Sequence, residues 1–181
     1  MFVNAKIETD RLIIRPYIDE DAEPIFQMLQ VPDHYKYIPD ELPTSIQQVM
    51  RLIQWSKECN EKNTPEKIYK FNLAVLLKET GQFVGVCGLG PCDVKEGEIE
   101  LYYEITREFQ GKGFAKEAAQ AIFEYGINRI GLKRIVTTVH PDNLASRAII
   151  EGLGMEYVKD LDGLTGDLEE HNGYRFYQIN V

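Results

Sequence analysis

The sequence contains little cysteine, histidine and tryptophan, and it has no long apolar run. Its 181 residues include three cysteines, three histidines and one tryptophan. Cys59, Cys87 and Cys92 are odd in number and lack the C-x-x-C or histidine spacing of a zinc site, so we expect reduced thiols and no metal. No stretch approaches the length of a membrane span, and residues 1–6 lack the apolar core of a signal peptide. These absences lead us to expect a cytoplasmic protein without a membrane partner.

Basic charge is also in deficit. The chain has 20 Lys and Arg against 29 Asp and Glu, a formal net charge of −9, which argues against a nucleic-acid partner because a phosphate backbone needs a basic surface. Residues 107–147 depart from this balance, with seven basic and four acidic residues, so they carry +3 and the remainder carries −12. Two interpretations stay open: an ordinary solvated surface, or a basic part that receives an anionic cofactor beside acidic surroundings that attract a cationic substrate.

Hydrophobic periodicity predicts a mixed α/β fold. With 44% hydrophobic residues, no repeat and no Pro/Gly-rich linker, the chain suits a single domain over residues 1–181. Strands are expected over residues 11–18, 71–78, 82–89, 98–105, 134–140, 155–160 and 174–180. Helices are expected from caps at 19–21 to residue 29, over 44–58, from a glycine turn to residue 130, and from caps at 141–143 to residue 151. The unit 98–140 should be a parallel strand–helix–strand crossover, and residues 162–172 should form a mobile surface loop.

The segment Gln110-Gly111-Lys112-Gly113-Phe114-Ala115 lies between a predicted strand and an amphipathic helix. The first N–H groups of a helix lack partners within it and sit at its positive end, and two glycines let the backbone approach an anion closely. The spacing differs from a P-loop, and Lys116 stands where a dinucleotide turn has its third glycine. Taken alone, this turn is either a plain connector or a phosphate-binding site.

Three motifs together carry a family resemblance. Residues 109–118 (Phe-Gln-Gly-Lys-Gly-Phe-Ala-Lys-Glu-Ala), 139–146 (Val-His-Pro-Asp-Asn-Leu-Ala-Ser) and 152–155 (Gly-Leu-Gly-Met) resemble the GNAT superfamily of acetyl-CoA-dependent N-acetyltransferases. The opening Glu8-Thr-Asp-Arg-Leu-Ile-Ile-Arg-Pro16 is similar to its RimJ/RimL branch, whose founding members acetylate ribosomal-protein N-termini. The resemblance spans residues 8–180. It implies a mostly antiparallel central sheet flanked by helices, with a parallel, splayed pair of central strands.

The resemblance also assigns residues to coenzyme A. It implies that the strand end at Ile105 and Thr106 pairs its backbone with the pantetheine arm. Asn143 would contact the same arm, and Ser146 would lie near the sulfur. The pyrophosphate would be held by backbone N–H groups of the turn, formed by Gln110, Gly111, Lys112, Gly113, Phe114 and Ala115.

Aminolysis of a thioester needs a base for the amine and benefits from a donor for the thiolate. Glu100, ten residues before Gln110, broadly matches the family's general-base glutamate and could act through a water. Glu98, Tyr102 and Glu104 share its strand face by alternation, which places several carboxylates where they raise one another's pKa, or else leaves them as solvated residues on an open strand.

The family's usual thiolate donor is missing from this chain. Many members have a tyrosine seven residues beyond the motif asparagine, where this chain has Ile150. Ser146 or an ordered water then becomes the candidate donor. The alternative for Ser146 is a serine at a helix start that satisfies backbone N–H groups.

The remaining histidines and aromatic residues favour structural roles. His34, His140 and His171 are not spaced for a triad, and His140 is expected to be structural. Tyr35-Lys36-Tyr37 falls in the loop where the family builds its acceptor pocket, so its rings are either pocket lining or local packing. Trp55 is expected in the core or at a helix–helix contact.

The resulting hypothesis is an enzyme that transfers acetyl from acetyl-CoA to a primary amine by direct attack in a ternary complex. The acidic remainder favours a cationic acceptor, such as a ribosomal-protein N-terminus or a small cationic amine. Two alternatives stay open: a non-catalytic acyl-CoA-binding or sensing module, and a nucleotide-binding module that uses the same turn. A homodimer is a family-level expectation that the sequence itself does not indicate.

Overall fold

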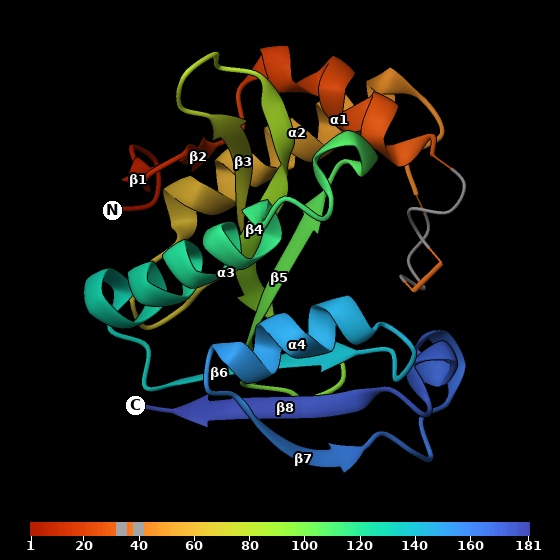
Figure 1. The fold of residues 1–181 in the computed structure, drawn as a ribbon. Helices are drawn as coiled ribbons and strands as arrows, with labels where there is room; N and C mark the ends of the chain where they lie inside the picture. Colours follow the sequence, from red (N-terminus) through yellow and green to blue (C-terminus); the bar gives the residue numbers. More distant parts are fainter. Residues whose placement is uncertain (32–35, 38–41) are drawn as a thin grey trace.

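The computed structural model describes residues 1–31, 36–37 and 42–181, and these residues surround one eight-stranded sheet (Figure 1). The strands are β1 (Ile7–Glu8), β2 (Leu12–Pro16), β3 (Phe71–Leu77), β4 (Phe83–Pro91), β5 (Ile99–Ile105), β6 (Arg134–Val139), β7 (Glu156–Asp160) and β8 (Arg175–Asn180). Their order across the sheet is β1-β2-β3-β4-β5-β6-β8-β7. All neighbours are antiparallel except β5 and β6, which are parallel. The predicted mixed fold with a parallel central pair is confirmed.

The helices largely follow the predicted periodicity. They are α1 (Ala22–Leu29), α2 (Ile46–Lys62), α3 (Phe114–Tyr125) and α4 (Leu144–Gly152), with short 3-10 turns η1 (Asp19–Asp21), η3 (Arg107–Phe109) and η5 (Gly166–His171) and the π-helical turn η4 (Gly126–Ile130). Gly131 ends the α3–η4 segment with a φ of 87°, a conformation that favours glycine.

Three features differ from the sequence predictions. The two-residue strand β1 is additional, because so short a strand carries no periodicity. The predicted loop 162–172 contains the 3-10 turn η5. Trp55 is 46% exposed and is not a core residue, since α2 already packs with Val49 and Ile53. The prediction of Trp55 as a core residue was therefore wrong, and the alternative of a helix–helix contact stays a prediction.

The sheet has two covered faces. Side chains alternate along β3, so Leu73 and Val75 enter the apolar cluster of α3 and α4, whereas Ala74 enters the cluster of α1 and α2. Figure 1 shows α3 in front of the sheet and α2 behind it. Along β5 the same alternation places Leu101 and Ile105 on the α3 face, so Glu100 lies on the α1/α2 face.

The two parallel strands diverge. The described ladder between β5 and β6 has one registered pair, Glu100 with Val136, and Figure 1 shows β5 leading away from β6 beyond it. Side chains bridge the strands near this pair, because the Thr137 hydroxyl donates to the Leu101 carbonyl at 3.0 Å. The ends of both strands therefore lack each other as backbone partners, and this is where the sheet opens.

Gly88 in β4 makes room for a tyrosine on the α1/α2 face. The Tyr102 hydroxyl donates to Asn72 Oδ1 across β4, and a Cβ built on Gly88 would lie 2.2 Å from that hydroxyl oxygen and 2.3 Å from the Phe71 carbonyl oxygen. A carbon atom at this Cβ position would displace either the Tyr102 ring or the neighbouring backbone. Position 88 therefore has room for glycine but not for a residue with a side chain.

Gly88→Ala is expected to lower the free energy of unfolding by about 2 kcal/mol or more, because the added methyl overpacks this site. Urea unfolding measures the change. Gly152→Ala is the matched control, since nothing lies within 4 Å of a Cβ there, and it should instead raise stability by up to about 1 kcal/mol. Equal effects of the two substitutions would contradict the packing role of Gly88.

Candidate functional site

The glycine turn follows β5 and opens α3. Gly111 and Gly113 both have left-handed backbone, with φ of 73° and 81°, and Gly113 is the N-cap of α3. No atom of the described residues lies within 4 Å of a Cβ built on Gly111. The Gln110 side-chain amide donates to the Ile105 carbonyl at 2.9 Å and so ties the turn to the strand end. This geometry directs the unpaired N–H groups of a helix start toward a surface that a ligand can approach.

The flanking residues of the turn contribute backbone rather than side chains to such a surface. Phe114 is buried and packs edge-on against Phe109, with ring centroids 5.8 Å apart. Ala115 is half-buried against the α3 core. Lys112 is exposed, and its ammonium lies 5.3 Å from the Phe109 ring centre. Lys112 is thus the cationic side chain within the turn.

The strand end supplies one of its two predicted residues to the open edge. The Thr106 amide donates to the Val84 carbonyl of β4 at 2.9 Å, so it does not point toward β6. Backbone groups alternate along a strand, so those of Ile105 and Tyr103 face the opening. The Thr106 hydroxyl is buried and has no hydrogen-bond partner among the described residues. A polar ligand lying along this edge would supply one, which fits the resemblance to coenzyme A-binding proteins.

Asn143 and Ser146 open α4 across from β5. Asn143 Oδ1 accepts from the Ser146 amide at 3.1 Å, so Asn143 rather than Ser146 caps the helix. The Ser146 hydroxyl lies 2.9 Å from the Tyr103 hydroxyl, which also donates to the Ser146 carbonyl at 3.2 Å. The alternative of Ser146 as a helix-start cap is thus not what the structure shows.

Tyr103 is the residue that sequence reasoning missed. It lies on the α3 face of β5, and burial raises the pKa of its phenol to about 12, an effect that the Ser146 hydrogen bond offsets in part. The phenol therefore keeps its proton at neutral pH. Ile150, at the position where the resemblance implies a tyrosine, is 1% exposed and lies in the core. Strand alternation placed Tyr103 opposite Glu100, but its contact with Ser146 depends on how α4 packs.

Glu100 is held at the junction of the two diverging strands. Its Oε1 accepts from both the amide and the hydroxyl of Thr138 in β6, each at 2.8 Å. Burial raises the pKa of the Glu100 carboxyl, and the Thr138 hydrogen bonds counteract part of that rise. The carboxyl is thus oriented by β6 and retains its proton to higher pH than an ordinary glutamate.

The other residues on this strand face do not form a carboxylate cluster with Glu100. Glu98 pairs with Arg134 at 3.2 Å and lies 3.9 Å from Lys95. The Tyr102 phenol bonds Asn72, and burial is the main cause of its raised pKa. Glu104 is half-buried. Burial is the main cause of the raised pKa of Glu100, and the Asp93 carboxylate adds a smaller rise, while the Glu100 carboxylate itself contributes to the raised pKa of Tyr102.

An aromatic cluster closes the end of β6. His140 packs against Tyr37 and Tyr174, with ring centroids 4.9 and 5.1 Å apart, which agrees with a structural role. The Tyr174 hydroxyl donates to the Tyr37 carbonyl at 3.2 Å. His171 packs on the other side of Tyr174 at 5.5 Å. His34 and Tyr35 lie outside the described residues, so whether Tyr35 lines a pocket stays a prediction.

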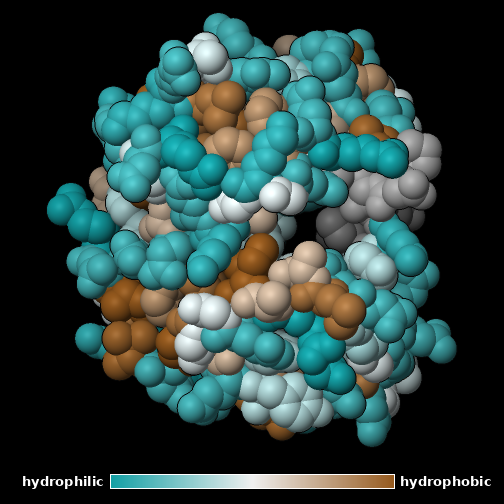
Figure 2. Space-filling model, in the orientation of Figure 1, coloured by the Kyte–Doolittle hydropathy of each residue, from teal (hydrophilic) through white to brown (hydrophobic). Residues whose placement is uncertain are grey.

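The surface is hollowed between the end of β5 and the start of α4 (Figure 2). A second hollow, of about 470 Å³, lies between β1 and α3 and includes Thr9 and Glu117. Glu100, Asn143 and Ser146 do not line that second hollow. The candidate site is therefore the opening between the diverging strands.

Residues 1–31, 36–37 and 42–181 contain no group of three His, Cys, Asp or Glu side chains placed to hold a metal ion. Within the same ranges no helix has the length and apolar character needed to cross a membrane. All three cysteines are buried free thiols, as predicted.

The chain belongs to the GNAT family of acetyltransferases. The family model described as "Acetyltransferase (GNAT) domain" matches residues 11–156. This range includes the glycine turn, both diverging strands and the start of α4, so the elements of the candidate site lie within the matched part of the chain. The chain is thus an N-acetyltransferase of the kind that uses acetyl-CoA, and a nucleotide-binding module of another family is no longer an alternative.

Individual relatives support the assignment to the GNAT family. The chain is 30% identical over 165 residues to an uncharacterized N-acetyltransferase, p20, from Bacillus licheniformis, covering 91% of this chain and 88% of the relative. A GNAT-family acetyltransferase structure from Bacillus anthracis superposes with a TM-score of 0.79 at 24% identity over 97% and 98% of the two chains. RimL, a ribosomal-protein acetyltransferase solved in complex with coenzyme A, shares the fold with a TM-score of 0.74 at 17% identity over 98% of each chain.

Glu100→Gln should change how stability depends on pH. The pKa of Glu100 is raised above 4.5 in the folded chain. The folded chain therefore binds this proton more tightly than the unfolded chain does, and it loses stability as pH rises from about 4.5 through the raised pKa. Glutamine does not titrate. The free energy of unfolding of the variant minus that of the unmodified protein should therefore grow as pH rises from about 4.5 and then level off. Urea unfolding across pH 4 to 8 tests this, and a constant or shrinking difference would contradict the raised pKa.

Proposed function

We propose that residues 1–181 act as one domain that transfers acetyl from acetyl-CoA to a primary amine by direct attack in a ternary complex. The observation that carries the proposal is the junction of β5 and β6. There the Glu100 carboxyl on one face and the Ser146 and Tyr103 hydroxyls on the other border the same opening, and the glycine turn lies at the end of β5.

In this proposal the turn binds the pyrophosphate of coenzyme A through backbone N–H groups of residues 110–115. The edge at Ile105 pairs with the pantetheine arm, and Asn143 and Ser146 border it from α4. The Thr106 hydroxyl lies buried at the same edge and can donate to the arm. The thioester supplies the activated acetyl group, so the chain needs only to orient the two substrates and move protons.

Glu100 removes the proton of the attacking amine, directly or through a water. Because Thr138 orients one carboxyl oxygen, the carboxyl has a defined direction at the junction. Its raised pKa makes the Glu100 carboxylate a stronger base than an ordinary carboxylate.

Ser146 donates a hydrogen bond to the departing thiolate, and Tyr103 supports it. The Tyr103 phenol stays protonated, so it can turn its one proton from the Ser146 carbonyl to the Ser146 hydroxyl oxygen while the Ser146 hydroxyl donates to sulfur. A thiol has a pKa of about 8.5, so the thiolate is a tolerable leaving group and this donor pair can replace the tyrosine that Ile150 displaces.

The acceptor in this proposal is a cationic amine, with a ribosomal-protein N-terminus favoured over a small cationic amine. The residues outside 107–147 carry −12, which attracts such an acceptor. RimL acts on a ribosomal protein and shares the fold. An α-amine has a pKa of about 8 against about 10.4 for a lysine or polyamine, so a single carboxylate base suffices more readily for a terminus.

Glu100→Gln should lower kcat/KM for the amine about 100-fold, the usual scale of general-base catalysis. Thiol release from acetyl-CoA over a panel of N-terminal peptides, polyamines and aminoglycosides measures it. The advantage of the unmodified protein should shrink as pH falls, because protonation of the raised-pKa carboxyl removes the base. Turnover that is unaffected by the substitution would exclude Glu100 as the base, and binding without turnover on every acceptor would favour the sensing module.

Ser146→Ala and Tyr103→Phe should each lower kcat by about tenfold or more, since each removes a member of one donor pair. The double variant should lose little beyond Ser146→Ala alone, because the two hydroxyls act together. Tyr157→Phe, on the exposed strand β7, is the matched control and should leave kcat unchanged. Additive losses in the double variant would contradict a shared role.

A further inference from the structure

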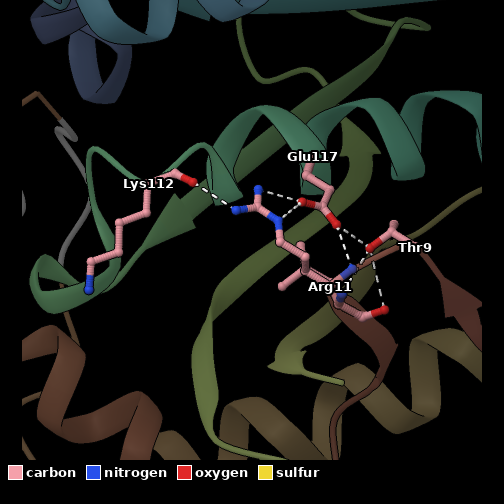
Figure 3. Close-up of polar contacts among 5 residues, drawn as sticks. Thr9, Arg11, Lys112 and Glu117 are labelled. Atoms are coloured by element: carbon pink, nitrogen blue, oxygen red, sulfur yellow. Dashed lines mark hydrogen bonds and ion pairs between the residues drawn. The ribbon is translucent and has the colours of Figure 1, made fainter. Parts of the chain in front are cut away.

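Arg11 connects the N-terminal segment to the glycine turn across more than one hundred residues of sequence. It precedes β2, and its guanidinium donates to the Lys112 carbonyl at 3.0 Å. The same guanidinium donates through Nε to Glu117 Oε2 at 2.6 Å, and its second terminal nitrogen lies 2.6 Å from that oxygen. Figure 3 shows this fork between the turn and the first turn of α3.

The Lys112 contact orients a peptide plane within the turn. A peptide unit is planar and trans, so its carbonyl and the following N–H point in opposite directions. Arg11 holds the Lys112 carbonyl toward itself, and this directs the Gly113 N–H away from Arg11. Figure 3 shows the Lys112 side chain also pointing away from Arg11. The Lys112 ammonium and the Gly113 N–H therefore both lie on the side of the turn that faces away from Arg11.

The Arg11 guanidinium also packs against Phe114 and Gly113. Its central carbon lies 4.3 Å above the Phe114 ring, the first residue of α3. A Cβ built on Gly113 would lie 3.4 Å from an Arg11 terminal nitrogen, so the turn and the side chain are in contact. Arg11 thus touches three consecutive residues of the turn and helix start, Lys112 to Phe114.

Glu117 needs this partner because of its position. It lies in the first turn of α3, the same helix end to which a pyrophosphate would bind, and an unpaired carboxylate there would repel the ligand. Arg11 neutralises it, and Thr9 donates its hydroxyl to Glu117 Oε1 at 2.5 Å while the Arg11 amide donates to the same oxygen at 3.0 Å. Burial raises the pKa of the Glu117 carboxyl, but these hydrogen bonds outweigh it and the net shift is downward, so the carboxyl stays ionised and paired.

We propose that Arg11 is a positioning residue for coenzyme A: it sets the Lys112–Gly113 peptide plane and neutralises Glu117, and so determines the affinity of the turn for the pyrophosphate. The proposal rests on the proposed function, because it assumes that the turn binds this group. Arg11 itself does not touch the ligand; it acts through the turn.

The test compares Arg11→Lys with Arg15→Lys. Arg15 makes a forked pair with Asp21, at 2.7 and 2.9 Å, but does not contact the turn in the described structure. Both substitutions keep the charge and break an arginine–carboxylate pair, and only Arg11→Lys also removes a contact with the turn. Isothermal titration calorimetry with coenzyme A gives Kd, steady-state kinetics gives kcat and both KM values, and thermal unfolding gives Tm.

Arg11→Lys should raise Kd for coenzyme A and KM for acetyl-CoA about tenfold, with kcat and the acceptor KM within about twofold of the unmodified protein. Arg15→Lys should lower Tm and leave Kd within about twofold. Thr9→Val, a milder change in the same network, should raise Kd in the same direction and keeps the test available if Arg11→Lys does not fold.

Two failures are distinguishable. If Arg11→Lys and Thr9→Val lower Tm but bind coenzyme A as the unmodified protein does, Arg11 is only structural and the positioning role is overturned while the proposed function stands. If the unmodified protein does not bind coenzyme A, the proposed function and this inference are both overturned.

Discussion

The divergence of β5 from β6 is the constraint on which the site depends. Two parallel strands that stayed paired to their ends would satisfy each other's backbone groups and close the sheet. Here a single registered pair, Glu100 with Val136, joins them before they separate. Beyond that pair, side-chain hydrogen bonds connect the elements on either side: Thr138 bonds Glu100 on one face, and Tyr103 bonds Ser146 on the other. A polar side-chain contact on each face therefore joins the elements that border the opening.

The two faces of the sheet divide the proposed chemistry. The α1/α2 face carries Glu100, whose burial suits it to act on an amine, and the α3/α4 face carries the glycine turn and the hydroxyl pair, which suit a coenzyme A thioester. The N-terminal segment belongs to the second group, because Arg11 and Thr9 hold the start of α3. Residues at the beginning of the chain thus support a turn in its middle.

Most of the fold follows from local sequence rules. The glycine turn and the Asn143 cap were readable because each depends on a few adjacent residues, and the parallel pair followed from a strand–helix–strand pattern. The placement of Tyr103 against Ser146 could not be derived, since the two residues are 43 positions apart and meet only through the packing of α4. The Arg11 contacts could not be derived either, because Arg11 is more than one hundred residues from Lys112 and Glu117 in the sequence. Trp55 was misread because helical spacing alone does not say which face of α2 is buried.

The central claim is that coenzyme A binds in the opening between β5 and β6 with its pyrophosphate on the glycine turn. A crystal structure of the protein with acetyl-CoA tests this most directly. The account predicts pyrophosphate oxygens within hydrogen-bond distance of backbone amides in residues 110–115, and the thioester between Glu100 and Ser146. A ligand whose pyrophosphate lies away from that turn, or whose thioester reaches neither residue, would contradict it.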